Sequence, residues 1–107
     1  MTKEMLDGIL HKLQAKLSHA LGDRIEAVYL YGSRARGEAR PDSDIDVLVV
    51  IRGDFDYKNM LDQTIDNIVD LSLEYDVVIS RVFVSKDRFE HEMSPFLMNV
   101  RREALPL

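Results

Sequence analysis

The stretch that decides the fold runs from Gly32 to Val50 and reads GSRARGEARPDSDIDVLVV. Its second half, residues 45–51, is too short and too rich in valine and isoleucine for anything but a buried strand. Asp44 and Asp46 lie two apart at the start of this strand, and because side chains alternate between strand faces, both carboxylates point the same way. Adjacent carboxylates repel each other and need compensation at the entrance to a hydrophobic core. Mg²⁺ supplies it, since it is typically held by one or two carboxylates together with substrate phosphates; the alternative is that the acids are only turn residues.

The dipeptide Gly32-Ser33 precedes the acidic pair. Glycine lets the backbone approach a phosphate closely, and the Ser33 hydroxyl and the amides of the turn can hydrogen-bond phosphate oxygens. If residues 33–36 begin a helical turn, its dipole adds to this effect; the alternative is a plain strand-to-helix turn with Ser33 as N-cap. Three arginines are nearby cations: Arg34, Arg36 and Arg40. Spacing does not decide which of them faces the site, and Arg36 is the nucleotide-binding candidate.

Upstream of this stretch, apolar residues recur at helical spacing over 3–21, with Thr2 as N-cap and Gly22 as a stop. Residues 25–31 are β-branched and aromatic, which predicts a strand that ends at the Gly-Ser turn. We expect the tyrosines of that strand to pack in the core. The alternative is that Tyr31, beside the turn, borders the nucleotide.

Downstream, apolar spacing predicts a second helix over 57–74, and DVVISRVFVS predicts a third strand over 76–85. Residues 87–104 have a helical pattern that Pro95 interrupts, so we expect a new helix over 95–104. Its apolar residues exceed what a free terminal helix needs and indicate a surface for a partner or for self-association. The element order predicts the α+β class, with a small mixed sheet and helices packed against it.

The composition of the 107-residue chain favours one domain, residues 1–107. The absence of cysteine excludes disulfides and thiolate metal sites and makes a reducing, cytoplasmic setting the expectation. Charges interrupt the apolar positions of the first helix, so we expect neither a signal peptide nor a membrane span. A net charge of −5 disfavours nucleic acid as a partner.

Gly32-Ser33, ten further residues and then Asp44-Ile45-Asp46 together resemble the signature of the DNA polymerase beta nucleotidyltransferase superfamily. GSRARG with SDIDVLVV is similar to its minimal, MNT-type branch. The resemblance implies the nucleotidyltransferase fold, with ATP as the first choice of donor. It also implies two Mg²⁺ ions and an in-line attack by an acceptor oxygen on the α-phosphate.

The resemblance further implies a third metal-binding carboxylate on a later strand. Asp76, which opens DVVIS, is the position that best matches it, and Asp76 would then help to activate the acceptor hydroxyl. The alternative is that Asp76 is an ordinary acid at the start of a strand or the end of a helix. The predicted catalytic and metal-binding set is therefore Asp44, Asp46 and Asp76.

Larger members of the superfamily have an acceptor-binding domain that this sequence does not show, so a partner is expected to present the acceptor. In the minimal branch that partner is often a HEPN-type ribonuclease, and the two resemble a toxin–antitoxin pair. The leading hypothesis is an antitoxin that transfers AMP to a hydroxyl of such a toxin. The alternatives are a non-catalytic module that neutralises its partner by contact, and an enzyme that modifies a small molecule such as an antibiotic.

Overall fold

The computed structural model describes residues 1–107. The helices are α1 (Lys3–Leu21), α2 (Ser33–Arg36), α3 (Tyr57–Tyr75), α4 (Lys86–His91) and α5 (Pro95–Glu103), and a 3-10 turn covers Gly22–Arg24. The strands are β1 (Ile25–Tyr31), β2 (Ile45–Ile51), β3 (Ile79–Ser85) and β4 (Leu105–Pro106). They form one mixed sheet in the order β3-β2-β1-β4, in which only the β2–β3 pair is parallel. The expected α+β fold class is confirmed. None of the helices is both long and apolar enough to cross a membrane.

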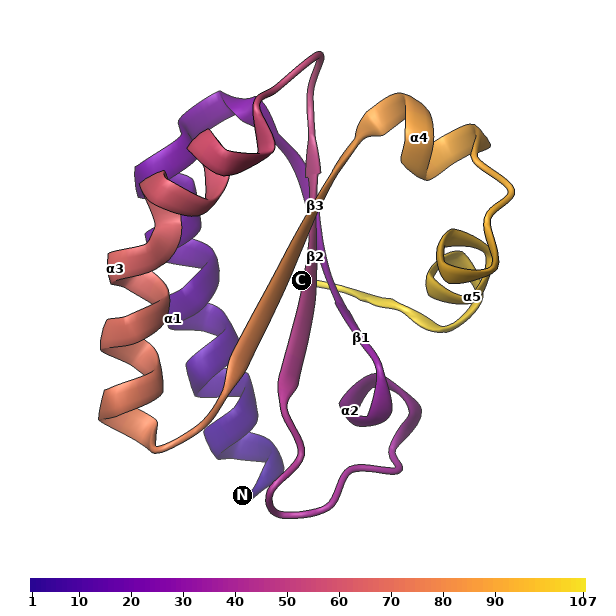
Figure 1. Cartoon of the computed structure of the whole chain (residues 1–107). Helices are drawn as coiled ribbons and strands as arrows, with labels where there is room; N and C mark the ends of the chain where they lie inside the picture. The colour runs from indigo at the N-terminus through magenta and orange to yellow at the C-terminus, as the bar shows by residue number, and fades with distance from the viewer.

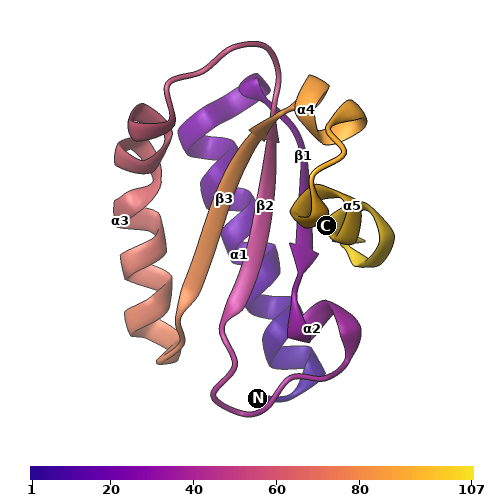
Figure 2. The same ribbon diagram turned by 45° about the vertical axis from the view of Figure 1, so that its right-hand side comes forward.

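The sheet separates two layers of helices (Figures 1 and 2). Helices α1 and α3 cover one face, and α4 and α5 cover the other. Residues of β2 alternate between the two cores, so that Val47 and Val49 pack under α1 and α3, whereas Leu48 and Val50 pack under α4 and α5. Asp46 lies two residues before Leu48 on the same strand, so its side chain points to the α4/α5 face as well.

Local sequence signals account for most element ends. The Thr2 side chain accepts a hydrogen bond from the Met5 N–H at the start of α1, and Gly22 ends that helix with φ 60°. The strand boundaries predicted at 25–31 and 45–51 are those observed. A helical turn over 33–36 is also present, as α2.

The prediction for the third strand was wrong at its start. β3 begins at Ile79, and Asp76 is instead the C-cap of α3, in the left-handed conformation with φ 52° and ψ 53°. Its N–H donates to the Ser72 carbonyl, so it completes the last helical turn. Aspartate tolerates this conformation better than most residues, which is why an acid can end the helix where glycine usually does.

The break at Pro95 is confirmed, and the new helix, α5, ends at Glu103 rather than at 104. The Ser94 hydroxyl accepts a hydrogen bond from the Leu97 N–H and caps α5. The short strand β4, which the sequence pattern did not predict, then pairs with β1, and the Leu107 N–H donates to the Val28 carbonyl. These contacts hold α5 against the sheet.

Two neighbouring arginines of α5 provide a test of how this helix is anchored. Arg101 donates from Nη1 to the Phe89 carbonyl at 2.7 Å and from Nη2 to the Glu92 carbonyl at 2.6 Å, whereas Arg102 is exposed and reaches only Asn99. Arg101→Ala should lower the free energy of unfolding by about 1–3 kcal/mol, because two carbonyls lose a charged donor. Arg102→Ala should change it by less than about 0.5 kcal/mol in the same urea titration. Equal losses for the two variants would contradict this anchoring role.

Candidate functional site

Asp46 lies at the start of β2 between a residue of each neighbouring strand. Its Cα partner on β1 is Tyr31, and its partner on β3 is Ser80. Paired residues on adjacent strands project to the same side of a sheet, so the three side chains share the α4/α5 face. Asp44 is exposed and lies one residue before the strand.

The two carboxylates influence each other. Burial raises the pKa of Asp46, the neighbouring Asp44 carboxylate raises it further, and Arg36 acts in the opposite direction. A half-buried carboxylate that faces a second one is costly unless a cation joins the site. The repulsion between the two carboxylates therefore favours the binding of a divalent ion with oxygen ligands, such as Mg²⁺.

Two features of its position favour glycine at residue 32. Its φ of 77° and ψ of −158° lie in a region that side-chain-bearing residues rarely adopt. In addition, a Cβ at residue 32 would lie 2.5 Å from Asp46 Oδ2. The backbone of the Gly-Ser turn is therefore seated directly against the second aspartate of the pair.

The turn continues as α2, a single helical turn beside the start of β2 (Figure 2). The N–H groups of Ala35 and Arg36 both donate to the Gly32 carbonyl at 3.1 Å, and the Glu38 N–H donates to the Ser33 carbonyl. Ser33 is thus the first helical residue rather than the N-cap, and Gly32 holds the capping position. From the sequence we predicted that Gly32, Ser33 and the two aspartates lie together, and in the structure the Gly-Ser turn lies against Asp46.

Arg34 holds the loop that leads to the aspartates. Its Nε and Nη2 donate to the Ser43 carbonyl at 3.2 and 2.6 Å. The same serine closes a turn, since its Oγ accepts from the Arg40 N–H and its own N–H donates to the Arg40 carbonyl. Arg34 therefore fixes the residue immediately before Asp44.

Arg36 connects the Gly-Ser turn to α5. Its Nε donates to Glu38 Oε2 at 3.0 Å and its Nη1 donates to Glu103 Oε1 at 3.1 Å. Its charge also acts on Asp46, which places the guanidinium at the edge of the site. Of the three arginines considered from the sequence, Arg36 is the one whose charge reaches the acidic pair.

Asp76 lies apart from the pair. As the C-cap of α3 it lines a shallow hollow with loop residues Pro41, Asp42 and Ser43. No three acidic, histidine or cysteine side chains of the chain are grouped so that they could hold a metal ion. The structure brings Asp44 and Asp46 together and places Asp76 at the end of α3, beside the loop that precedes the pair, where the three do not form a metal-binding group. A third metal-binding carboxylate at Asp76 stays a prediction.

Two aromatic residues, Tyr31 and Phe96, border the site. The rings of Tyr31 and Phe96 meet edge to face, with centroids 5.6 Å apart. Burial, followed by the charge of Asp46, raises the pKa of Tyr31 to about 12. Tyr31 thus both packs in the α4/α5 core and lies beside the acidic pair, while Phe96, from a helix 65 residues further on, was not identifiable as a neighbour from its spacing.

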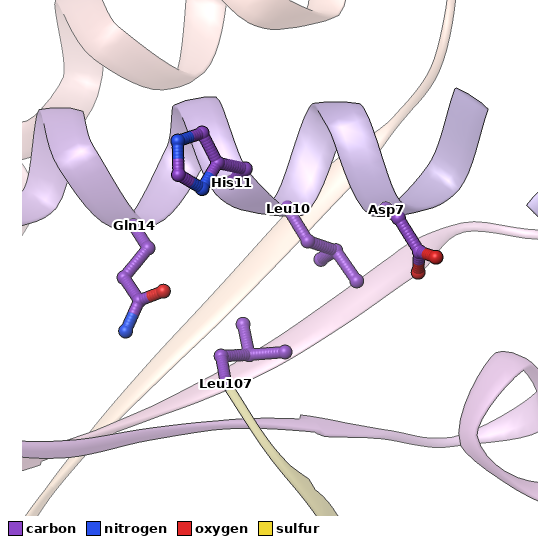
Figure 3. Close-up of a pocket in the computed structure, with 5 residues that line it drawn as sticks. All are labelled: Asp7, Leu10, His11, Gln14 and Leu107. Carbon is purple, nitrogen blue, oxygen red and sulfur yellow. The ribbon is translucent and has the colours of Figure 1, made fainter. Parts of the chain in front are cut away.

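A separate hollow lies between α1 and the end of the chain (Figure 3). It is lined by Asp7, Leu10, His11, Gln14 and Leu107. None of these residues belongs to the Gly-Ser turn or to the acidic strand. This hollow is therefore not part of the site.

The stretch of chain that contains the site matches a known protein family. Residues 11–94 match the family described as "Polymerase beta, Nucleotidyltransferase". The chain belongs to this family. It is accordingly a nucleotidyltransferase, and the matched residues include the Gly-Ser turn and both aspartates.

Relatives of this nucleotidyltransferase include two proteins of Methanocaldococcus jannaschii, both named "Putative protein adenylyltransferase". One is 40% identical over 81 residues, which cover 75% of this chain and 75% of the relative. The other is 34% identical over 79 residues, which cover 73% of this chain and 78% of the relative.

Two solved structures share the fold of the nucleotidyltransferase. A crystal structure of "a putative nucleotidyltransferase from Sulfolobus solfataricus" matches with a TM-score of 0.55 at 19% identity, covering 99% of this chain and 87% of that one. A crystal structure of a toxin–antitoxin with AMP-PNP matches with a TM-score of 0.56 at 21% identity, covering 87% and 70%. At these identities the matches establish the fold alone.

The contact between Gly32 and Asp46 can be tested by a double-mutant cycle in the nucleotidyltransferase. Gly32→Ala should lower the free energy of unfolding by about 1–3 kcal/mol, because a φ of 77° with a ψ of −158° disfavours any side chain. It should lower it by about 0.5–1.5 kcal/mol more, because Asp46 Oδ2 must rotate away from the new Cβ. In the Asp46→Ala background the second part should disappear, because the carboxylate is gone. Gly22→Ala, with φ 60°, ψ −138° and open space around its Cβ, is the control for backbone strain alone. Additivity of the two changes would contradict the contact.

The position of Tyr31 beside Asp46 gives a second test. Because the negative carboxylate disfavours the phenolate, Asp46→Asn should lower the pKa of Tyr31 from about 12 toward the ordinary value of tyrosine. Ultraviolet absorbance titration of the metal-free protein measures this, and Tyr31→Phe assigns the transition among the four tyrosines. An unchanged pKa in Asp46→Asn would mean that the two groups are not neighbours.

Proposed function

We propose that this nucleotidyltransferase transfers AMP from ATP, in the presence of Mg²⁺, to a hydroxyl group on a partner protein. The observation that carries the proposal is the seating of the Gly32 backbone against Asp46, with Asp44 beside it. That arrangement places a turn suited to phosphate next to carboxylates suited to a cation. The names of the relatives from M. jannaschii support a protein as the acceptor.

The residues present fit a divalent ion. Asp44 and Asp46 offer carboxylate oxygens close enough for the charge of Asp44 to raise the pKa of Asp46, and this repulsion is relieved when a cation binds. When bound, Mg²⁺ would offset the charge of the triphosphate and of the pyrophosphate that leaves. Asp76 is given no metal-binding role in this proposal, because it does not group with the pair as a third candidate ligand.

Other residues of the turn would bind and orient the donor. Amide groups at the start of α2 and the Ser33 hydroxyl are donors for phosphate oxygens. Arg36 is a cation at the edge of the site, and exchange of one of its carboxylate partners for a phosphate would cost little at an exposed position. Together these groups would bind the phosphates of the donor and orient it for attack by the acceptor.

The reaction itself is a substitution at phosphorus. The acceptor oxygen forms a bond to the α-phosphorus, the bond from this phosphorus to the bridging oxygen breaks, and pyrophosphate leaves. The proton of the acceptor hydroxyl passes to a carboxylate of the pair. The products are an adenylylated hydroxyl and pyrophosphate.

The acceptor belongs to a protein in this proposal, with a toxin of a toxin–antitoxin pair, of HEPN ribonuclease type, as the first candidate. A structurally similar protein is a toxin–antitoxin described with AMP-PNP, which supports an adenine nucleotide as donor and a protein as partner. The α5 surface beside the site also supports a protein acceptor, since Phe96 and Met98 are 42% and 46% exposed there. Addition of AMP would silence the toxin.

Label transfer tests the proposal. ATP labelled at the α-phosphate, with Mg²⁺, should label one protein in a lysate of the source cells, whereas ATP labelled at the γ-phosphate should label none. Asp46→Asn should reduce the labelling at least about 100-fold, because a metal-binding carboxylate is lost. Asp42→Asn, a nearby loop acid outside the pair, is the matched control and should retain it.

Two outcomes would contradict the proposal. Equal labelling by wild type and Asp46→Asn would show that the acidic pair is not the site. No labelling by either, while the Asp46→Asn protein still neutralises its partner, would favour a module that acts by contact alone.

A further inference from the structure

The residue on β3 that lies beside Asp46 is a serine. The parallel pairing of β2 and β3 places Ser80 directly opposite Asp46, and adjacent strands are roughly 4.8 Å apart. Val82, the next residue of the same parity, packs in the α4/α5 core. The Ser80 side chain therefore projects to the face that holds the acidic pair.

Ser80 is neutral, and no acidic residue lies near enough to Asp46 to replace it as a third carboxylate of the site. Glu38 and Glu103, on the flanks of the site, both bind Arg36. Asp76 ends α3 and lines the hollow beside residues 41–43. The carboxylate content of the site is therefore Asp44 and Asp46, in keeping with the absence of any group of three candidate metal ligands.

The number of carboxylates limits the number of ions. Two divalent cations a few ångströms apart repel each other strongly, and sites that hold such pairs supply carboxylates to both ions and commonly share one between them. One pair of carboxylates together with the phosphates of a nucleotide suffices for a single Mg²⁺, which retains several waters. A serine hydroxyl adds no charge to offset a second ion.

We propose that the site holds one divalent ion, bound together with the nucleotide, and that the neutral side chain of Ser80 beside Asp46 is what excludes a second. This rests on the proposed function and narrows it, since the resemblance to the superfamily had implied two ions. It also predicts that a single substitution, Ser80→Asp, completes a two-ion site.

The test counts ions instead of turnover. Mn²⁺ replaces Mg²⁺, and α,β-methylene-ATP, which cannot transfer AMP, saturates the protein. Electron paramagnetic resonance then gives the number of bound Mn²⁺ ions per chain and detects magnetic coupling between close ions. Wild type should bind one uncoupled ion, and Ser80→Ala should do the same. Ser80→Asp should bind two coupled ions.

A matched control separates position from added charge. Ser18→Asp adds one carboxylate on the exposed surface of α1, in the layer on the opposite face of the sheet, and should still bind one ion. Two coupled ions in wild type would overturn the inference but not the proposed function, and this measurement does not depend on any variant folding. A single ion in a folded Ser80→Asp protein would overturn the role of Ser80. No ion in the nucleotide complex would overturn both proposals.

Discussion

The backbone of Gly32 lies so close to Asp46 that a methyl group at residue 32 would be 2.5 Å from the carboxylate oxygen Oδ2. This contact joins the end of β1 to the start of β2, which are already paired through Tyr31 and Asp46. Helix α2 begins at the next residue; its Arg34 donates to the Ser43 carbonyl of the acidic loop, and its Arg36 donates to Glu103 of α5. The Gly-Ser turn, the acidic loop and α5 thus meet beside this close approach of backbone and carboxylate.

The alternation of side chains along β2 determines which residues lie on the same face of the sheet as this contact. Alternate residues of β2 fill two different cores, so a buried strand can begin with a polar residue only where one face is open at its end. Asp46 occupies that position, and its parity directs it toward Tyr31 and Ser80. The half-buried setting raises the pKa of Asp46 and makes a cation favourable there.

Much of the fold could be predicted from sequence because local signals were strong. Thr2 and Gly22 delimit α1, and the Val/Ile run of β2 has no plausible helical reading. Asp76 was misplaced because DVVIS is rich in strand formers, whereas the left-handed conformation at its aspartate depends on how α3 ends. The neighbours Ser80 and Phe96 could not be predicted, since strand register and the packing of α5 arise only from tertiary contacts.

We propose that the α4/α5 face at the start of β2 binds the nucleotide and its metal ion. The most direct test is paramagnetic broadening of backbone amide NMR signals by Mn²⁺ bound with a non-transferable ATP analogue. We expect selective broadening at residues 32–36, at residues 44–46 and at Ser80, with the α1 and α3 layer far less affected. Broadening centred on the hollow of Figure 3, or on Asp76 without the acidic pair, would contradict it.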